Sequence, residues 1–155
     1  MTKKYELVLS DTIEFSGYTL FRIRSRSYFG KVKMGDLGGY IQSEKNLSHE
    51  GNAWVSENGK VYEYAEVCDN AEVSGNSQAS GNAKVCENAW ISGNTHVTDN
   101  SIISGNAWMT GNAKASHNAK VSGNNWISGS THVTGDAEAT RDTWIKYDME
   151  VRGNI

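Results

Sequence analysis

Small and apolar positions recur along most of this chain with a period of six residues. From Gly51 to Arg152 the sequence divides into seventeen consecutive hexads, with no insertion or deletion. The fifth place is always Val, Ile, Met or Ala, and the third place is small except at Asn125 and Met149. Successive side chains of a strand point to opposite faces, so these two places share one face and the fourth place points outward. The pattern predicts short strands wound around a narrow apolar interior, because an α-helix would repeat about every 3.6 residues.

The corners between these strands are predicted at the first two places of each hexad. The second place is Asn in twelve hexads and Asp in three, and Gly is frequent at the first place. Both Gly and Asn tolerate left-handed backbone angles at low cost. We therefore expect both places to adopt the sharp turns that close a coil.

Tryptophan sets the length of one complete turn. Its five occurrences all fall in the fourth place, with spacings of 36, 18, 18 and 18 residues and Glu72 in the skipped slot: Trp54, Trp90, Trp108, Trp126 and Trp144. A coil of three hexads places them all on one wall. The predicted fold is all-β, a parallel β-helix of nearly six turns with a triangular cross-section. Ile41 and Leu47 keep the register, so the predicted β-helix covers residues 39–155.

The residues before the repeat predict a second, smaller unit, an N-terminal β cap over residues 1–38. The segment TIEFSGYTLFRIR is two alternating runs around Ser16 and Gly17, which predicts a hairpin. An open β-helix end exposes unpaired backbone groups, and the hairpin would cover them. At the other end, charged and bulky residues are expected to prevent end-to-end stacking: Arg141, Lys146, Tyr147 and Arg152.

The repeated form V-S-G-N-A-x resembles the hexapeptide repeat of left-handed β-helices, over about two-thirds of the chain. Its GNA-rich version is similar to bacterial and phage proteins of the polymer-forming or hexapeptide-like type, and the leader resembles that of phage-type members. The resemblance implies left-handed winding and a tendency to assemble, with trimers packed wall against wall. The acyltransferases of the family imply an enzymatic alternative, in which a histidine at a cleft between subunits acts as general base.

Net charge and composition give no sign of a membrane or nucleic-acid partner. Residues 1–38 carry seven basic and four acidic residues, a net charge of +3, and residues 39–155 carry eight and fourteen, a net charge of −6. No apolar run approaches the ~18 residues of a membrane span. We therefore expect a cytoplasmic protein with no membrane partner and without direct nucleic-acid binding.

Histidines and cysteines give little indication of catalysis. His96 and His132 occupy the same outward place two turns apart, about 10 Å, which is too far to share one metal ion. Cys68 and Cys86 lie in one column of adjacent turns, with Cα atoms expected ~5 Å apart. In the cytosol we expect two reduced thiols in ordinary Ser or Thr positions, and the pair lacks further metal ligands. We expect no catalytic residue, no cofactor and no bound metal.

Two surfaces are candidates for binding. The tryptophan column is predicted to be an interface with another subunit or a partner, because Trp is typical of interface hot spots; the alternative is a ladder of stacked rings that stabilises the coils. A basic column beside it, with an arginine row in the leader, is a candidate site for an anionic, nucleotide-like ligand: Lys60, His96, Lys114, His132, Arg22, Arg24 and Arg26.

These features predict a non-catalytic binding solenoid of phage type. It would engage a host protein, or sequester a small nucleotide, in the cytoplasm of a bacterial host as a counter-defence factor. We expect a homo-oligomer, with a trimer favoured. The alternatives are a structural, self-assembling solenoid and a trimeric acyltransferase.

Overall fold

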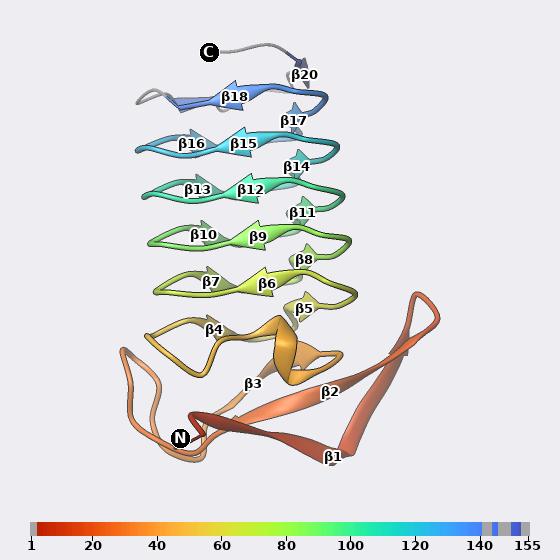
Figure 1. Cartoon of the computed structure of the whole chain (residues 1–155), viewed down its shortest axis with the longest axis vertical. Coiled ribbons are helices and arrows are strands. Elements are labelled where there is room, and N and C mark those ends of the chain that lie inside the picture. The colour runs from red at the N-terminus through yellow and green to blue at the C-terminus, as the bar shows by residue number, and fades with distance from the viewer. Residues whose placement is uncertain (1–2, 141–143, 146–149, 153–155) are drawn as a thin grey trace.

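The protein is an all-β solenoid with an antiparallel hairpin at its N-terminal end (Figure 1). A computed structural model describes residues 3–140, 144–145 and 150–152. Within these residues the strands form sheets of nine, six and five strands. Adjacent coils pair as parallel strands with an offset of 18 residues, which confirms the predicted coil length. No helix in this part of the chain is both long and apolar enough to cross a membrane.

Each sheet contributes one wall of the solenoid. The tryptophan wall contains β4 (Trp54–Val55), β7 (Glu72–Val73), β10 (Trp90–Ile91), β13 (Trp108–Met109), β16 (Trp126–Ile127) and β19 (Trp144–Ile145). The basic wall contains β5 (Lys60–Val61), β8 (Gln78–Ala79), β11 (His96–Val97), β14 (Lys114–Ala115), β17 (His132–Val133) and β20 (Glu150–Val151). The mixed wall contains β6 (Glu66–Val67), β9 (Lys84–Val85), β12 (Ile102–Ile103), β15 (Lys120–Val121) and β18 (Glu138–Ala139).

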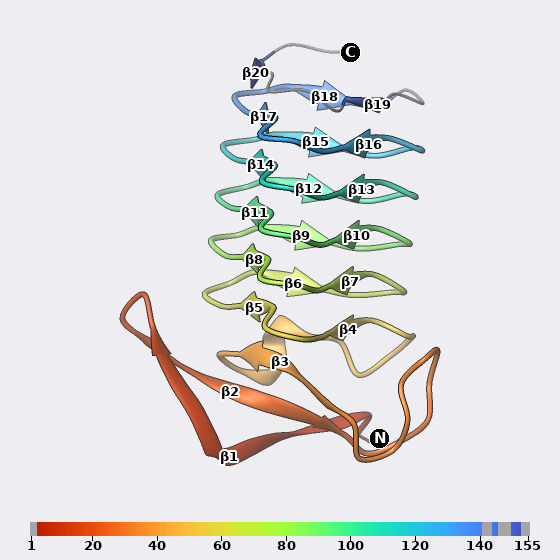
Figure 2. The same ribbon diagram turned by 180° about the vertical axis from the view of Figure 1, so that it is seen from behind.

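The coils wind in a left-handed sense. In Figure 1 the chain rises from the N-terminal end, crosses the near side from right to left along the mixed wall, and returns behind it along the tryptophan wall. Figure 2 shows the same course from the opposite side. The winding agrees with the expectation from the repeat.

The leader forms the predicted hairpin and continues into the solenoid. β1 (Tyr5–Phe15) and β2 (Tyr18–Ser25) pair antiparallel around a turn at Ser16 and Gly17. β3 (Leu37–Ile41) pairs antiparallel with β2 and parallel with β5, so the hairpin extends the sheet of the basic wall. A short 3-10 helix, η1 (Glu44–Asn46), follows. β3 thus crosses the predicted boundary between residues 38 and 39, and the division into two units stays a prediction.

Side chains of the leader and the first coil satisfy backbone carbonyls at the N-terminal end of the solenoid. Lys4 Nζ donates to the carbonyl of Ala53 at 2.6 Å, and Tyr5 Oη donates to that of Leu47 at 2.6 Å. Asn46 Nδ2 donates to the carbonyl of Ala65 at 2.8 Å. These carbonyls would otherwise be buried without partners, which costs free energy.

The corners differ from the sequence expectation in one respect. Within the described repeat, positive φ angles occur at the first place of the hexads and not at the Asn of the second place; examples are Gly75 (65°), Asp69 (57°) and His117 (59°). Acidic residues at the first place add a hydrogen bond that Gly lacks. The Oδ2 atom of Asp69 accepts from the N–H of Glu87 at 3.0 Å, and that of Asp99 accepts from the N–H of His117 at 2.9 Å.

The Asn residues of the second place instead form ladders along the corners. Asn88 Nδ2 donates to Asn106 Oδ1 at 3.2 Å, and Asn106 Nδ2 donates to Asn124 Oδ1 at 2.9 Å. Asn94 and Asn112 form the equivalent contact at the next corner, at 3.2 Å. The prediction that both places form the turns of the corners is confirmed, but the left-handed backbone angle belongs to the first place alone, and the Asn side chains of the second place hydrogen-bond one coil to the next.

The interior contains the third and fifth places, as predicted. Val97, Ile103, Met109 and Val121 are fully buried, with neighbouring Ala residues between them. Asn125, the exception at a third place, is also buried, and its Nδ2 atom donates to the carbonyl of Ala139. The terminal positions Arg141, Lys146 and Tyr147 lie outside the described residues, while Arg152 is exposed and pairs with Glu150.

Replacing Val97 by Asp should unfold the protein. The side chain is fully buried, so the carboxylate would be placed in a dry interior without a partner, which costs several kcal/mol (roughly 5 or more). Far-ultraviolet circular dichroism during urea unfolding measures the effect. Lys114→Asp, an exposed change one coil away on the same wall, is the matched control and should stay folded. A stable, folded Val97→Asp protein would contradict the inward assignment of the fifth place.

Candidate functional site

The tryptophan wall presents a continuous stack of indoles. Trp90 pairs with Trp108, and Trp108 with Trp126, in the parallel register of neighbouring strands. The rings of Trp90 and Trp108 are 4.9 Å apart and 1° from parallel, and those of Trp108 and Trp126 are 4.8 Å apart and 5° from parallel. The distance matches the spacing of parallel strands, so the backbone itself sets the stack.

The outer face of this stack is apolar and uncharged. Trp90 Nε1 donates to Ser74 Oγ at 2.9 Å, and Trp108 Nε1 donates to Ser92 Oγ at 3.2 Å, so the polar atom of each of these two rings is bonded within the wall. Trp90 is 41% exposed, whereas Trp108 and Trp126 are half-buried. Asn ladders line both corners of the wall. Glu87 is exposed at the corner before Trp90, so the border is polar and carries this one charge beside the ring; an apolar centre with a polar rim is the composition of a protein interface.

Trp54, at the N-terminal end of the same column, is not available for contact. It is only 5% exposed because the leader covers it. Phe29 packs edge-to-face on the ring at 5.3 Å, and Tyr5 does so at 6.3 Å. The sequence prediction placed Trp54 in the interface, and here the structure corrects it. The side chain of Trp144 lies outside the described residues, although its backbone pairs with that of Trp126.

The residues of the basic column lie in register, as predicted, but some of them already have partners within the chain or a lowered pKa. Lys60 Nζ lies 5.1 Å from the centre of the Phe15 ring and donates to the carbonyl of Asn58. Burial lowers the pKa of Lys60. Burial, and then the charge of Lys114, lower the pKa of His96, so its imidazole is neutral at pH 7. Lys114 is exposed in the next coil.

His132 belongs to a cluster of hydroxyls and imidazoles at one corner. Ser116 Oγ lies 2.8 Å from His132 Nε2 and 3.2 Å from His117 Nδ1, and Thr134 Oγ1 lies 2.9 Å from the latter atom. A hydroxyl beside an imidazole is half of a nucleophile–base arrangement. The neighbouring carboxylate of Asp99 accepts from the backbone N–H of His117 rather than from a ring, so it does not orient the base.

The contact between Ser116 and His132 also belongs to a regular series. An outward side chain contacts the sixth-place residue 16 positions earlier in four further cases among the described residues, on two walls: Ser56 with Glu72, Ser74 with Trp90, Ser92 with Trp108, and Tyr62 with Gln78. A contact that the repeat generates on several walls is a feature of the architecture, so it gives no specific support to the enzymatic alternative.

The arginine row of the leader is engaged mainly within the cap. Arg22 pairs with Asp11 at 3.2 Å and donates to the carbonyl of Gly38 at 2.8 Å. Arg24 pairs with Glu6 at 2.8 Å. Arg26 is exposed but lies beyond the end of β2, so the three residues do not form one row along a strand.

The structure adds one cluster that sequence reasoning missed. Cys68, Asp69 and Cys86 lie together at a corner, with their ligand atoms within 4.8 Å of one another. The period places Cys68 and Cys86 in one column, and it places Asp69 only at the first, corner place of its hexad. Its position directly after Cys68, at the start of the next hexad, was the available signal.

The sequence matches no protein-family model, and no curated protein matches it significantly. Function is therefore inferred from the walls of the solenoid themselves.

Trp108→Ala should destabilise the protein more than Trp90→Ala. Trp108 has stacking partners on both sides, whereas Trp90 has Glu72 in place of one of them. Each stacked pair contributes about 0.5–1.5 kcal/mol, so the difference between the two variants should be of that size. Urea unfolding at a protein concentration too low for association isolates this effect. Equal losses in both variants would show that ring stacking contributes nothing measurable.

Proposed function

We propose that the protein is a non-catalytic binding solenoid whose copies associate through the tryptophan wall. The observation that carries the proposal is the stack of Trp90, Trp108 and Trp126, which presents hydrocarbon edges on an uncharged face. Isolated exposed aromatics are common on monomers, but a contiguous stripe of them favours a covered surface.

The leader of the same chain already covers one end of this wall. Trp54 is buried by Phe29 and Tyr5, two aromatic residues from a distant part of the sequence. The same wall therefore already accepts protein contacts at its lower end. A second chain that contacts the upper indoles would extend this contact and bury more apolar surface, at about 25 cal/mol per Å² before the cost of association.

A second copy of this chain is the occupant that fits best. Its walls repeat at the same 4.8–4.9 Å spacing, so two copies can match indole for indole along the stack. The absence of charged fourth-place residues between Trp90 and Trp126 removes like-charge repulsion between identical faces. The resemblance of the repeat to trimeric hexapeptide β-helices supports a cyclic trimer as the arrangement.

A small anionic ligand has weaker support. Of the four residues of the basic column, Lys60 is held between the Phe15 ring and the Asn58 carbonyl, burial lowers the pKa of His96, and His132 is bonded to Ser116. Lys114 alone therefore offers a plainly available cation in this column. Binding of a host protein to the tryptophan wall, instead of a second copy of this chain, is the other outcome of the following experiment.

The double variant Trp108→Ala/Trp126→Ala tests the proposal. Neither side chain fills the interior, so circular dichroism should show a folded solenoid. Loss of two hot-spot residues, each worth about 2 kcal/mol or more, should weaken self-association at least ~100-fold. Sedimentation velocity and native mass spectrometry measure the mass. Lys120→Ala/Glu138→Ala, an exposed pair in the same two coils on the mixed wall, is the matched control and should keep the parent mass.

Two results would overturn self-association through this wall. One is a folded double variant with the oligomer state of the parent. The other is a parent that sediments as a monomer throughout the accessible concentration range. In the second case the wall would have to serve a different protein, and the double variant should then lose binding to that partner.

A further inference from the structure

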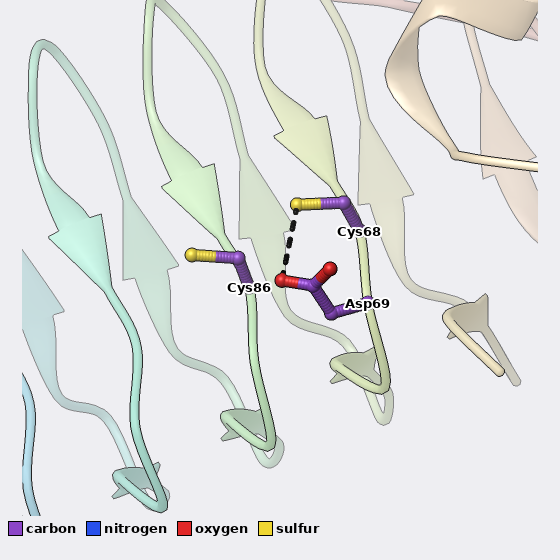
Figure 3. A group of neighbouring side chains, drawn as sticks. All are labelled: Cys68, Asp69 and Cys86. Carbon is purple, nitrogen blue, oxygen red and sulfur yellow. Dashed lines mark hydrogen bonds between the residues drawn. The ribbon is translucent and has the colours of Figure 1, made fainter. Parts of the chain in front are cut away.

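The geometry points to a binding site for a thiophilic divalent cation of the zinc type, formed by Cys68, Asp69 and Cys86. The two sulfur atoms and a carboxylate oxygen all lie within 4.8 Å of one another. Figure 3 shows both thiols pointing to the same side from adjacent coils, with the carboxylate of Asp69 beside them. Both cysteines of the chain are used in this one place.

The backbone fixes the positions of both cysteines. The N–H of Cys68 donates to the carbonyl of Val85 at 3.0 Å, and the N–H of Cys86 donates to that of Ile103 at 3.0 Å. Both residues directly follow strands of the mixed wall, β6 and β9, which pair in register. Ligands carried by regular strands hold their geometry better than ligands carried by loops.

Asp69 lies in position as a third ligand because of its backbone conformation. Its φ of 57° turns the chain at the corner, and its Oδ2 atom accepts from the N–H of Glu87 in the following coil at 3.0 Å. The thiol of Cys68 also donates to Oδ2, at 3.9 Å. Both contacts use the same oxygen, so the second carboxylate oxygen can bind a cation.

The donor set and its spacing suit zinc. Zinc binds thiolate sulfur at about 2.3 Å and carboxylate oxygen at about 2.0–2.2 Å in tetrahedral geometry, so two sulfur ligands of one ion lie ~3.8 Å apart. The three ligand atoms lie within 4.8 Å of one another, so side-chain rotations that move them together by up to ~1 Å would complete the site. Two soft sulfur ligands discriminate against magnesium and calcium, which prefer oxygen. Three protein ligands leave a coordination position for water.

The surrounding charges favour a cation. Glu66 and Asp69 lie near the thiol of Cys68, and Asp69 and Glu87 lie near that of Cys86, where Lys84 is the one basic neighbour among the described residues. A divalent cation would displace one proton from each thiol and release both to solvent. Its charge would also offset the acidic residues around the site.

Titration of the full-length, fully reduced protein with Co²⁺ tests the site. Cobalt bound by two thiolates gives charge-transfer absorption in the near ultraviolet, and Zn²⁺ should abolish this absorption by displacement. Cys68→Ser and Cys86→Ser should each weaken binding by at least ~100-fold, and Asp69→Asn by on the order of 10-fold. Bound Zn²⁺ should also raise the unfolding midpoint of the parent, because it binds only the folded chain tightly.

Asp99→Asn is the matched control for Asp69→Asn. Asp99 occupies the first place of a hexad, has φ of 59°, and accepts from the N–H of the following coil, but Thr98 and Ser116 stand where the first site has cysteines. The control should bind cobalt as the parent does. Absence of thiolate absorption in the parent would overturn the site. Equal affinity of Asp69→Asn and Asp99→Asn would overturn the assignment of Asp69 as a ligand.

Discussion

The structure depends on the hydrogen bonds between successive coils. In each hexad from residue 51 to residue 122, backbone N–H groups donate to carbonyls of the following coil; the N–H of Trp90, for example, donates to the carbonyl of Ala107 and that of Ser92 to Met109. These bonds require coils of equal length, which explains why the repeat contains neither insertions nor deletions. Equal coils place equivalent residues directly above one another, so every surface feature of the protein is a column rather than a patch.

The period of the sequence was sufficient to predict the fold and the wall of each outward residue, and the alternating runs around Ser16 and Gly17 predicted the hairpin of the leader. Contacts between coils were harder to predict. The period shows that Asn88 and Asn106 are neighbours in the corner turns, but not that their side-chain amides hydrogen-bond to each other. The burial of Trp54 depends on Phe29, which lies in a segment of the leader without a repeat. The position of the Asp69 carboxylate could not be predicted from the period, because it depends on the backbone angle that turns this side chain toward the next coil.

The walls differ in how many of their outward polar groups form hydrogen bonds within the wall and how many remain in solvent. On the tryptophan wall the indole N–H groups of Trp90 and Trp108 are bonded to serines, and the carboxylate of Glu72 accepts a hydrogen bond from Ser56. On the mixed wall Lys120 and Glu138 keep solvated charges and form an exposed pair at 3.9 Å. A wall whose polar groups are already satisfied loses little when water leaves it, whereas removing water from exposed charges is costly. This difference makes the tryptophan wall the face best suited to contact.

A periodic surface has an inherent ambiguity, since two such surfaces can slide past each other by one period and still match most of their contacts. The covered Trp54 and the Glu72 above it break this symmetry. The leader forms a protruding shoulder at one end of the stack, and a carboxylate interrupts the run of aromatic rings beside it. Together they give an otherwise uniform face a defined origin, from which any second molecule would measure its position along the axis.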